Sequence, residues 1–420
     1  MVMTVGIDAK RIVRNGTGLG SYGRTLVNDL LRIGGGATAE DGGLVLRLYA
    51  PDEGRQELRE QVKANAAAVA AKPQPTKKAE KTQPTEETAA VAAKPQPTKE
   101  AEKTQPAEKT AAVWCFSGRK GAVAKAWWRT RGIVKDLVRD GVQVYHGLSG
   151  ELPTGLKKAG IHGVVTIHDL IFLRHPEYYH WWDVQLYAWK FRQTLKEADH
   201  IIAISERTRQ DIIELGGAEY ADHISVIYQS FSPRFTTKAT AEQKAAVRQR
   251  WQLPARYVLN VGTIERRKNV LLCAEALELM PQDVHLVVVG RQTDYVRELP
   301  QSERIHLLSG VPDDDLAVIY QQAEAFAYPS RYEGFGIPII EAIAAGLPVV
   351  ACTGSCLEEA GGPHCRYVGP DDVIGMAEAL KMSLKGAPER EERIRKSREY
   401  IRRFEGSDVA AQVMQVYQKV

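Results

Sequence analysis

The chain has 420 residues, of which 44% are hydrophobic, and a formal net charge of +4 at pH 7. A chain of this length exceeds one ordinary domain, so two domains of roughly 150 to 200 residues are expected. No apolar run approaches the roughly 18 residues of a membrane-spanning helix, and so small a net charge argues against a nucleic-acid-binding protein.

The start of the chain, MVMTVGIDAK, is typical of a first strand. It lacks the basic region and apolar stretch of an export signal, so we expect a cytoplasmic protein. The five cysteines, an odd number widely scattered, fit a reducing compartment.

Short apolar runs then alternate with helical stretches along the first half of the chain. The runs are VGID, LVLRLYA, VQVYHG, VVTIHD and HIIAIS. This alternation predicts a mostly parallel sheet, whose ligands would bind beyond the carboxyl ends of the strands.

Three glycines, Gly18, Gly20 and Gly23, give the spacing G-x-G-x-x-G between the first strand and a helix. The spacing superficially suggests a dinucleotide site, for which a lone match is weak evidence. An acidic ribose contact from Asp52 or Glu53, after the strand at 44–50, stays open.

A repeat interrupts the first domain. The segment AAVAAKPQPTK begins at Ala67 and again 22 residues later at Ala89, and AAV begins a third time at Ala111. The repeat carries almost nothing apolar beyond Ala and Val, so it cannot form a stacked core. We predict a disordered insert over 62–112; the alternative is a tether for a partner.

Two tracts combine aromatic with basic or polar residues. The first, GRKGAVAKAWWRTRGIVKDLVRD, interleaves Trp127 and Trp128 with basic residues, among them Lys120, Lys125, Arg129, Arg131, Lys135 and Arg139. The second, EYYHWWDVQLYAWKF, could reinforce it. Such tracts suit an anionic membrane surface or a phosphorylated lipid acceptor, hence a possible peripheral contact at the inner face of the plasma membrane. The alternative is an amphipathic helix that packs its tryptophans into the domain.

The strand VVTIH places His168 and Asp169 at its carboxyl end. His168 could orient hydroxyls or relay a proton. The alternative is an ordinary hydrogen-bonded histidine, and His146 in YHGLSGELP is a weaker candidate.

A second series of strands and helices opens at YVLNVG, so the second domain begins near 236. After its first strand, GTIERRKN brings Gly262, Arg267 and Lys268 to the edge of a cleft, where basic side chains would neutralise a diphosphate. The alternative is a solvated basic face.

The stretch from Glu333 to Glu341, EGFGIPIIE, places two carboxylates around a Gly-Phe-Gly turn. Gly334 and Gly336, with Phe335 between them, let backbone amides approach a ligand, and the helix that follows favours phosphate at its amino end. Glu341 would accept hydrogen bonds from two ribose hydroxyls and Glu333 from those of a hexose. The alternative is a loop glutamate and a capping glutamate.

One group of metal-ligating residue types, Cys352, Cys356, His364 and Cys365, lies close together in the sequence. Its spacing fits no common structural zinc framework, and the other interpretation is a loop with small buried thiols. We therefore predict no metal site.

The window around Glu333 resembles the E-x7-E signature of family-4 retaining glycosyltransferases, and the chain looks like the bacterial polysaccharide mannosyltransferase branch of that family. The resemblance extends over GTGLGSYGRTL, HGLSGELP, VVTIHDL, ADHIIAISERTRQDI, YVLNVGTIERRKN and LVVVGR. It implies the α/β GT-B fold, with two Rossmann-like doubly wound domains facing each other across a cleft. The implied parts are an acceptor domain over 1–235, a donor domain over 236–402 and a last helix over 403–420 that crosses back onto the first domain.

The resemblance also implies a reaction, the transfer of a hexose of mannose or glucose type from a GDP- or UDP-linked donor to a glycan or lipid-linked saccharide. It assigns the loop of Gly18 and Gly20 to the donor diphosphate and places His168 near the transferred sugar. Many relatives have Arg directly after Gly262, where this chain has Thr263. No cofactor is implied, and without an obvious D-x-D motif we expect metal independence. The alternatives are a GT-B sugar-nucleotide epimerase and a catalytically silent nucleotide-sugar-binding subunit.

Overall fold

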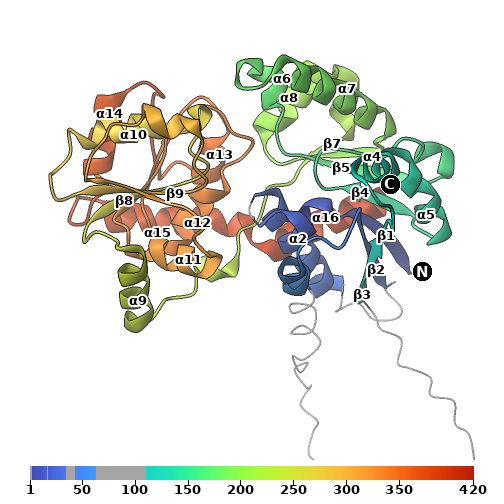
Figure 1. The fold of residues 1–420 in the computed structure, drawn as a ribbon, viewed down its shortest axis with the longest axis horizontal. Helices are drawn as coiled ribbons and strands as arrows, with labels where there is room; N and C mark the ends of the chain where they lie inside the picture. Colours follow the sequence, from blue (N-terminus) through green and yellow to red (C-terminus); the bar gives the residue numbers. More distant parts are fainter. Residues whose placement is uncertain (1, 17, 35–42, 63–109) are drawn as a thin grey trace, which may run out of the picture.

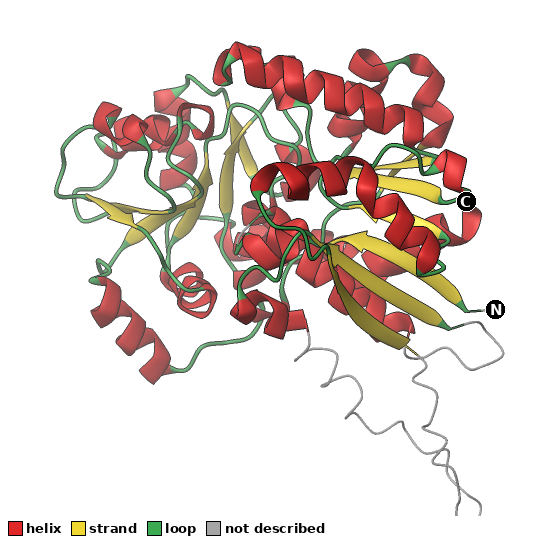
Figure 2. Cartoon of the chain, turned by 45° about the vertical axis from the view of Figure 1, so that its right-hand side comes forward, coloured by secondary structure: helices red, strands yellow, loops and turns green. Residues whose placement is uncertain are grey.

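The computed structural model describes residues 2–16, 18–34, 43–62 and 110–420, which form two parallel sheets side by side, each covered by helices (Figures 1 and 2). The predicted α/β class, with two Rossmann-like doubly wound domains, is confirmed.

The first sheet has seven strands in the order β3-β2-β1-β4-β5-β6-β7, and its neighbouring strands are parallel. The strands span Met3–Asp8 (β1), Leu44–Ala50 (β2), Thr110–Phe116 (β3), Val144–Gly147 (β4), His162–Ile167 (β5), His200–Ala203 (β6) and Ile224–Val226 (β7). The strand order changes direction between β1 and β4, so the loops after these strands flank the crevice in which such sheets bind ligands.

The second sheet has six parallel strands in the order β10-β9-β8-β11-β12-β13. They span Tyr257–Val261 (β8), His285–Val289 (β9), Ile305–Leu308 (β10), Ala325–Tyr328 (β11), Val349–Cys352 (β12) and Arg366–Val368 (β13). Here the order changes direction between β8 and β11. The loops after these two strands carry GTIERRKN and EGFG, which brings two distant motifs to one crevice.

The helices of the first domain are α1 (Lys10–Arg14), α2 (Leu19–Gly34), α4 (Ala122–Trp127), α5 (Ile133–Arg139), α6 (Ile171–Arg174), α7 (Trp181–Glu197) and α8 (Glu206–Gly216), with a helical stretch over 56–62 and a π-helical turn, Trp128–Gly132, between α4 and α5. The helices from the second domain onward are α9 (Ala241–Trp251), α10 (Val270–Leu277), α11 (Asp313–Gln322), α12 (Ile337–Ala345), α13 (Leu357–Gly361), α14 (Val373–Lys381), α15 (Arg390–Tyr400) and α16 (Gly406–Lys419). Short 3₁₀ turns include η3 (Pro176–Tyr178), η5 (Pro233–Phe235) and η6 (Arg266–Lys268).

Local sequence signals start several of these helices. Thr240 and Gln243 form a reciprocal capping box at the start of α9, and the Ser205 hydroxyl accepts from the Thr208 amide at the start of α8. In α2 the apolar residues fall on one face, and its buried side chains pack with β1 and β2 in the core of the first domain.

The last helix, α16, leaves the second domain and packs against α2 of the first (Figure 1). Val413 and Tyr417 of α16 are buried among the apolar side chains of the first domain. Tyr417 Oη is also hydrogen-bonded to Nδ1 of the buried His146, at 2.6 Å. The two domains therefore share this helix as a structural element.

The predicted boundaries of the insert, 62–112, are wrong at both ends. Val62 is 1% exposed and belongs to the core of the first domain, because it completes the apolar side of the helical stretch over 56–62. At the other end, Ala111 and Ala112 belong to β3 and pair with Val45 and Leu46 of β2. The rest of the predicted insert, 63–109, lies outside the described residues.

Among the residues that the structure describes, no helix combines the length and apolar character needed to cross a bilayer.

Candidate active site between the two domains

Three charged side chains, Lys268, Arg267 and Glu333, meet at the crevice of the second sheet. Lys268 Nζ lies 2.5 Å from Glu333 Oε1, and Arg267 Nη1 lies 3.0 Å from Glu333 Oε2. Lys268 Nζ also donates to Tyr328 Oη at 2.8 Å. We call Lys268, Arg267 and Glu333 the charge cluster; each side chain is largely shielded from solvent, with 16%, 16% and 11% exposed.

The three side chains of the charge cluster stabilise one another in their charged forms. Burial acts to raise the pKa of Glu333, but the attraction of Lys268 and Arg267 outweighs it and lowers that pKa to about 2. Burial likewise acts to lower the pKa values of Lys268 and Arg267, and Glu333 raises both. All three groups are therefore charged across the physiological pH range, with an excess of one positive charge.

Backbone contacts hold the two loops of the cluster together. The amide of Arg331 donates to the carbonyl of Arg267 at 2.9 Å, and Arg267 Nη1 donates to the carbonyl of Tyr332 at 2.7 Å. Gly262 lies beside the Lys268 stem, since a Cβ there would be 3.7 Å from Lys268 Cδ. Arg266, the third basic residue of the motif, points elsewhere, because it is 69% exposed and pairs with Glu298.

The Gly-Phe-Gly turn brings the first domain onto the cluster. A Cβ on Gly334 would lie 1.9 Å from the His168 carbonyl oxygen and 3.1 Å from Asp169 Cβ, so only glycine allows this approach. The Gly334 carbonyl accepts from Ser205 Oγ at 2.7 Å. His168 and Asp169 are thereby placed next to Glu333.

Both ring nitrogens of His168 have protein partners. Nε2 lies 2.7 Å from the carbonyl of Leu148, and Nδ1 lies 2.8 Å from the Gln229 amide nitrogen. A carbonyl needs a donor, so this arrangement fixes the neutral tautomer with its proton on Nε2. Burial lowers the pKa of His168 to about 4, which also favours the neutral ring. His168 can orient a neighbour in this state, but a proton relay requires Gln229 to move.

Asp169 is the acidic residue of the first domain that faces the cluster. Burial raises its pKa, while Arg267 and Lys268 act to lower it and Glu333 to raise it. Its Oδ1 accepts from the amide of Ile171 at 3.2 Å. Asp169 therefore contributes a carboxyl group from the first domain to the wall of the crevice that faces the charge cluster.

Glu341 lies on α12 and is separate from the charge cluster. Burial of its carboxyl group raises its pKa to about 8, although the residue as a whole is partly exposed. Its Oε2 accepts from Tyr320 Oη at 3.3 Å. Glu333 and Glu341 thus have opposite electrostatic environments despite their proximity in the sequence.

The remaining predicted residues are three glycines, which shape the local backbone, and Phe335. Gly18 has φ +51° with open space around its Cα, and Gly20 lets α2 approach the Asn15 carbonyl, which a Cβ would meet at 1.8 Å. Gly336 has φ +126° at the start of α12. The Phe335 side chain packs in the core against Tyr228 and Phe404 rather than in the crevice, so only its backbone is available to a ligand.

The cysteines weighed as zinc ligands are engaged in the interior. Cys356 Sγ donates to the carbonyls of Glu333 and Phe335, both at 3.1 Å, and Cys365 Sγ donates to that of Gly361. Among the described residues, no three His, Cys, Asp or Glu side chains are placed to share a metal ion. Cys356 instead helps to hold the turn that presents Glu333.

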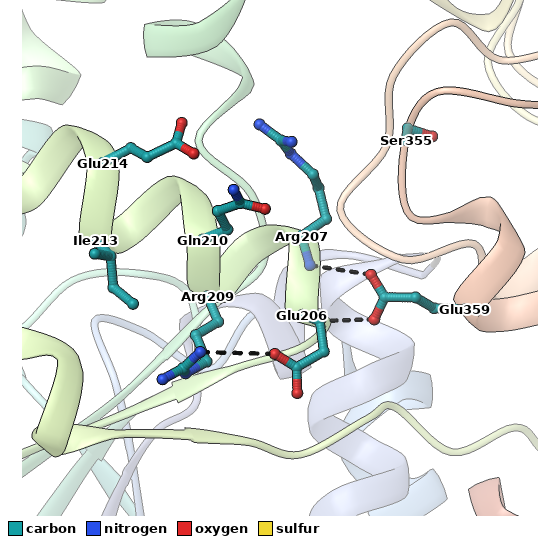
Figure 3. Close-up of a pocket in the computed structure, with 8 residues that line it drawn as sticks. All are labelled: Glu206, Arg207, Arg209, Gln210, Ile213, Glu214, Ser355 and Glu359. Atoms are coloured by element: carbon teal, nitrogen blue, oxygen red, sulfur yellow. Dashed lines mark hydrogen bonds and ion pairs between the residues drawn. The ribbon is translucent and has the colours of Figure 1, made fainter.

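A cavity of about 580 Å³ opens beside α8 (Figure 3), and none of the three residues of the charge cluster lines it. On one wall, the Glu359 carboxylate accepts from the backbone amides of Glu206 and Arg207, at 2.7 and 3.0 Å. A carboxylate of the second domain therefore caps a helix of the first. The lining mixes both charges, and we assign the cavity to the domain boundary.

Sequence reasoning missed the residues that support the cluster. Gln229, on the segment between β7 and η5, and Tyr328, at the end of β11, carry no motif of their own. The signal that could have found Tyr328 is its place at the end of a strand directly before the EGFG turn. No comparable signal marks Gln229, whose contact with His168 depends on the course of the inter-domain connection.

Comparisons with known proteins agree with this geometry. The family model described as Glycosyltransferase Family 4 matches residues 88–233, and the model described as Glycosyl transferases group 1 matches residues 243–400. The O-antigen chain mannosyltransferase B of Escherichia coli is 30% identical over 286 residues, which cover 65% of this chain and 74% of that protein. The O-antigen chain mannosyltransferase RfbU of Salmonella typhimurium is 27% identical over 227 residues, covering 52% of this chain and 59% of that protein.

Solved structures share the fold over the whole chain. The crystal structure of Anabaena Alr3699/HepE in complex with UDP and glucose has a TM-score of 0.67 at 15% identity, with 100% of both chains covered. That of WaaG, a glycosyltransferase involved in lipopolysaccharide biosynthesis, has a TM-score of 0.64 at 14% identity, with 99% of both chains covered.

Proposed function

We propose that this chain, which belongs to glycosyltransferase family 4, transfers a hexose from a nucleoside-diphosphate sugar to a hydroxyl of a glycan or lipid-linked saccharide, with retention of configuration. The chain is a glycosyltransferase; the donor, the acceptor and the stereochemistry are the proposal. The observation that carries it is the charge cluster, in which two cations and a carboxylate converge on the crevice between the domains.

The cluster suits the departure of a diphosphate. As the bond between the anomeric carbon and the diphosphate oxygen breaks, negative charge grows on that oxygen, and Lys268 and Arg267 would stabilise it. Their charges are already in place, because Glu333 and Tyr328 hold them, so little reorganisation is needed. Glu333 would also accept hydrogen bonds from hexose hydroxyls, and Glu341 from ribose hydroxyls.

We propose attack on the face from which the diphosphate leaves. The acceptor oxygen forms the new bond to the anomeric carbon, the diphosphate departs with the bonding electron pair, and its oxygen takes the acceptor proton. This route needs no side-chain nucleophile. It also agrees with the state of His168, whose two ring nitrogens are already hydrogen-bonded.

We propose mannose as the transferred sugar, in the synthesis of a cell-surface polysaccharide. The support is that several similar curated proteins bear names of mannosyltransferases, among them mannosyltransferase B and RfbU. Because these names belong to the relatives, glucose stays the alternative sugar, and the test below covers the nucleotides of both GDP- and UDP-linked donors. We further propose that the protein acts in the cytoplasm, peripherally at the inner face of the membrane, where a lipid-linked acceptor would be presented.

Two rivals keep the same crevice. A sugar-nucleotide epimerase would return the hexose still attached to its nucleotide or release it as free sugar, without forming a new glycoside. A silent subunit would bind a nucleotide sugar without turnover.

Calorimetric titration of the purified full chain with GDP, UDP and ADP tests the donor site first. We expect one nucleotide to bind selectively and Glu341→Ala to lose most of that affinity. Absence of binding to all three nucleotides would contradict the proposed donor site. Binding without turnover on any donor and acceptor pair would favour the silent subunit.

A further inference from the structure

Helix α7 presents an unusual outer surface. Trp182, Trp181 and Trp189 are 76%, 60% and 55% exposed, and Leu186 and Tyr187 beside them are 47% and 38% exposed. Side chains of this size are normally withdrawn from water. Val184, Ala188, Phe191, Thr194 and Leu195 of the same helix are buried, so α7 is anchored in the domain by its other side.

The charges on this surface have one sign. The exposed residues of α7 are Trp181, Trp182, Gln185, Leu186, Tyr187, Trp189, Arg192 and Lys196, and none is acidic. Within the described part of the chain, neither Arg192 nor Lys196 has an ion pair or a hydrogen-bonded partner through its side chain. We call these eight residues the α7 surface.

The other basic and aromatic tract, over 118–140, exposes fewer unpaired cations and aromatic side chains to a binding partner. Trp128 is 2% exposed and donates to Asp136, and Lys125 pairs with Asp52 at 2.7 Å. Arg129 lies between Asp8 and Glu151. Lys125 and Arg129 are therefore neutralised within the domain. The alternative interpretation, a helix that packs its tryptophans into the domain, holds for Trp128 but not for Trp127, which is 54% exposed.

The α7 surface lies close to the crevice along the chain. Asp169 is followed directly by α6 and η3, which lead into α7. The rings of Phe172 on α6 and Tyr187 on α7 are in edge contact, with centroids 5.7 Å apart. A surface held by α7 would therefore stay in a fixed relation to the acceptor side of the crevice (Figure 1).

We propose that the α7 surface docks the enzyme on an anionic lipid bilayer. Indole rings favour the headgroup region, where their apolar body and N–H group are both accommodated, and Arg192 and Lys196 would meet lipid phosphates. A protein partner would need its own acidic and apolar surface. The combination of three exposed tryptophans with unpaired cations fits lipid more directly. The inference rests on the proposed function, in which the acceptor is lipid-linked, and it assigns the membrane contact to the α7 surface.

The test is co-sedimentation of the full chain with vesicles of phosphatidylcholine alone and of phosphatidylcholine with phosphatidylglycerol. We expect binding to the anionic vesicles, a blue shift of tryptophan fluorescence, and weakening by high salt. The triple change Trp181→Ser, Trp182→Ser and Trp189→Ser should reduce binding by about tenfold or more. The pair Arg192→Gln and Lys196→Gln should abolish the preference for anionic vesicles.

Matched controls change exposed apolar residues elsewhere: Trp127→Ser on α4, 54% exposed, and Ile374→Ser on α14, 70% exposed. Both should bind vesicles as the wild type does, and nucleotide titration should be unchanged in every variant. Three results would overturn the inference: no binding of the wild type to anionic vesicles, full binding of the triple variant, or concentration-dependent self-association that the triple variant abolishes. If the wild type bound no nucleotide, that result would instead contradict the proposed function.

Discussion

At the scale of single residues, Glu333 and Glu341 show how environment divides two identical carboxyl groups. Glu333 lies between Lys268 and Arg267, which lower its pKa to about 2 despite burial. Glu341 is enclosed beside Tyr320, and burial raises its pKa to about 8. The first is a permanent anion that orders two cations, whereas the second changes charge within the physiological range.

Lys268→Ala should lower the rate of nucleoside diphosphate release by about 100-fold to 1,000-fold, because a preorganised charge is removed from the departing group. The measurement is steady-state turnover with the donor identified by calorimetry. Arg266→Ala is the matched control, since Arg266 is exposed and pairs with Glu298 rather than with the charge cluster. Equal loss in both variants would mean that overall positive charge, rather than the charge cluster, matters.

The raised pKa of Glu341 predicts pH-dependent binding. If the ionised carboxylate accepts the ribose hydroxyls, nucleotide binding below about pH 8 must release a proton. Affinity should then fall by up to about tenfold per pH unit below pH 8, and Glu341→Gln should flatten the profile. Calorimetry between pH 6 and 9 measures both, and a wild-type affinity independent of pH would contradict this role.

The raised pKa of Glu341 makes the stability of the fold depend on pH in the opposite direction to nucleotide affinity. The unfolded chain releases this proton near the ordinary value of 4.5, whereas the folded chain keeps it to about pH 8. The free energy of unfolding should therefore decrease between these pH values and level off above them. Thermal unfolding of Glu341→Gln should lack this contribution and give a higher Tm than the wild type at pH 8. An equal or lower Tm would contradict it.

At the scale of elements, the sequence was informative where chemistry and topology coincide. The loops after β8 and β11 could be placed at one crevice because parallel strands end on one side of a sheet. Trp128 and Phe335 show the limit, since each belongs to a motif that suggests binding yet packs inside. Whether a tryptophan faces solvent depends on the helix register against the sheet, which the composition of a tract does not determine.

Gly334 allows the close contact between the turn after β11 and the end of β5. Gly334→Ala places a Cβ against the His168 carbonyl, so the domains should no longer close fully. Turnover should fall by about a hundredfold while nucleotide affinity changes less, because most of the proposed nucleotide contacts, Glu341 among them, lie in the second domain. Gly369→Ala is the control, since a Cβ there would meet Asp372 Cβ at an ordinary 3.6 Å. A Gly334→Ala enzyme with normal turnover would show that this contact is dispensable.

At the scale of the whole molecule, α16 joins the two domains. Val413 is fully buried in the core of the first domain, although it lies in sequence after the second. Val413→Asp would bury a carboxylate without a partner and should reduce the free energy of unfolding by about 3 kcal/mol or more. Gln415→Asp, on an exposed position of the same helix, should change it little. Equal denaturation curves for the two variants would contradict this packing.

The two-domain architecture could be predicted from the alternation of strands and helices together with the family resemblance. The contacts between the domains could not, because they depend on how two separately folded surfaces meet. Ser205 and Glu359 illustrate this: one donates to Gly334 and the other caps α8, both across the domain boundary. Neither belongs to a sequence pattern that identifies its partner.

The central claim is that this chain forms a glycosidic bond with retention while releasing a nucleoside diphosphate. The most direct measurement is proton NMR of the product made from the α-linked donor sugar and a saccharide acceptor, with the nucleotide product identified in the same sample. We predict an α-linked hexose on the acceptor and one nucleoside diphosphate released per bond formed. A β-linked product, a hexose epimerised on its nucleotide or free in solution, or no turnover with any donor would contradict the account.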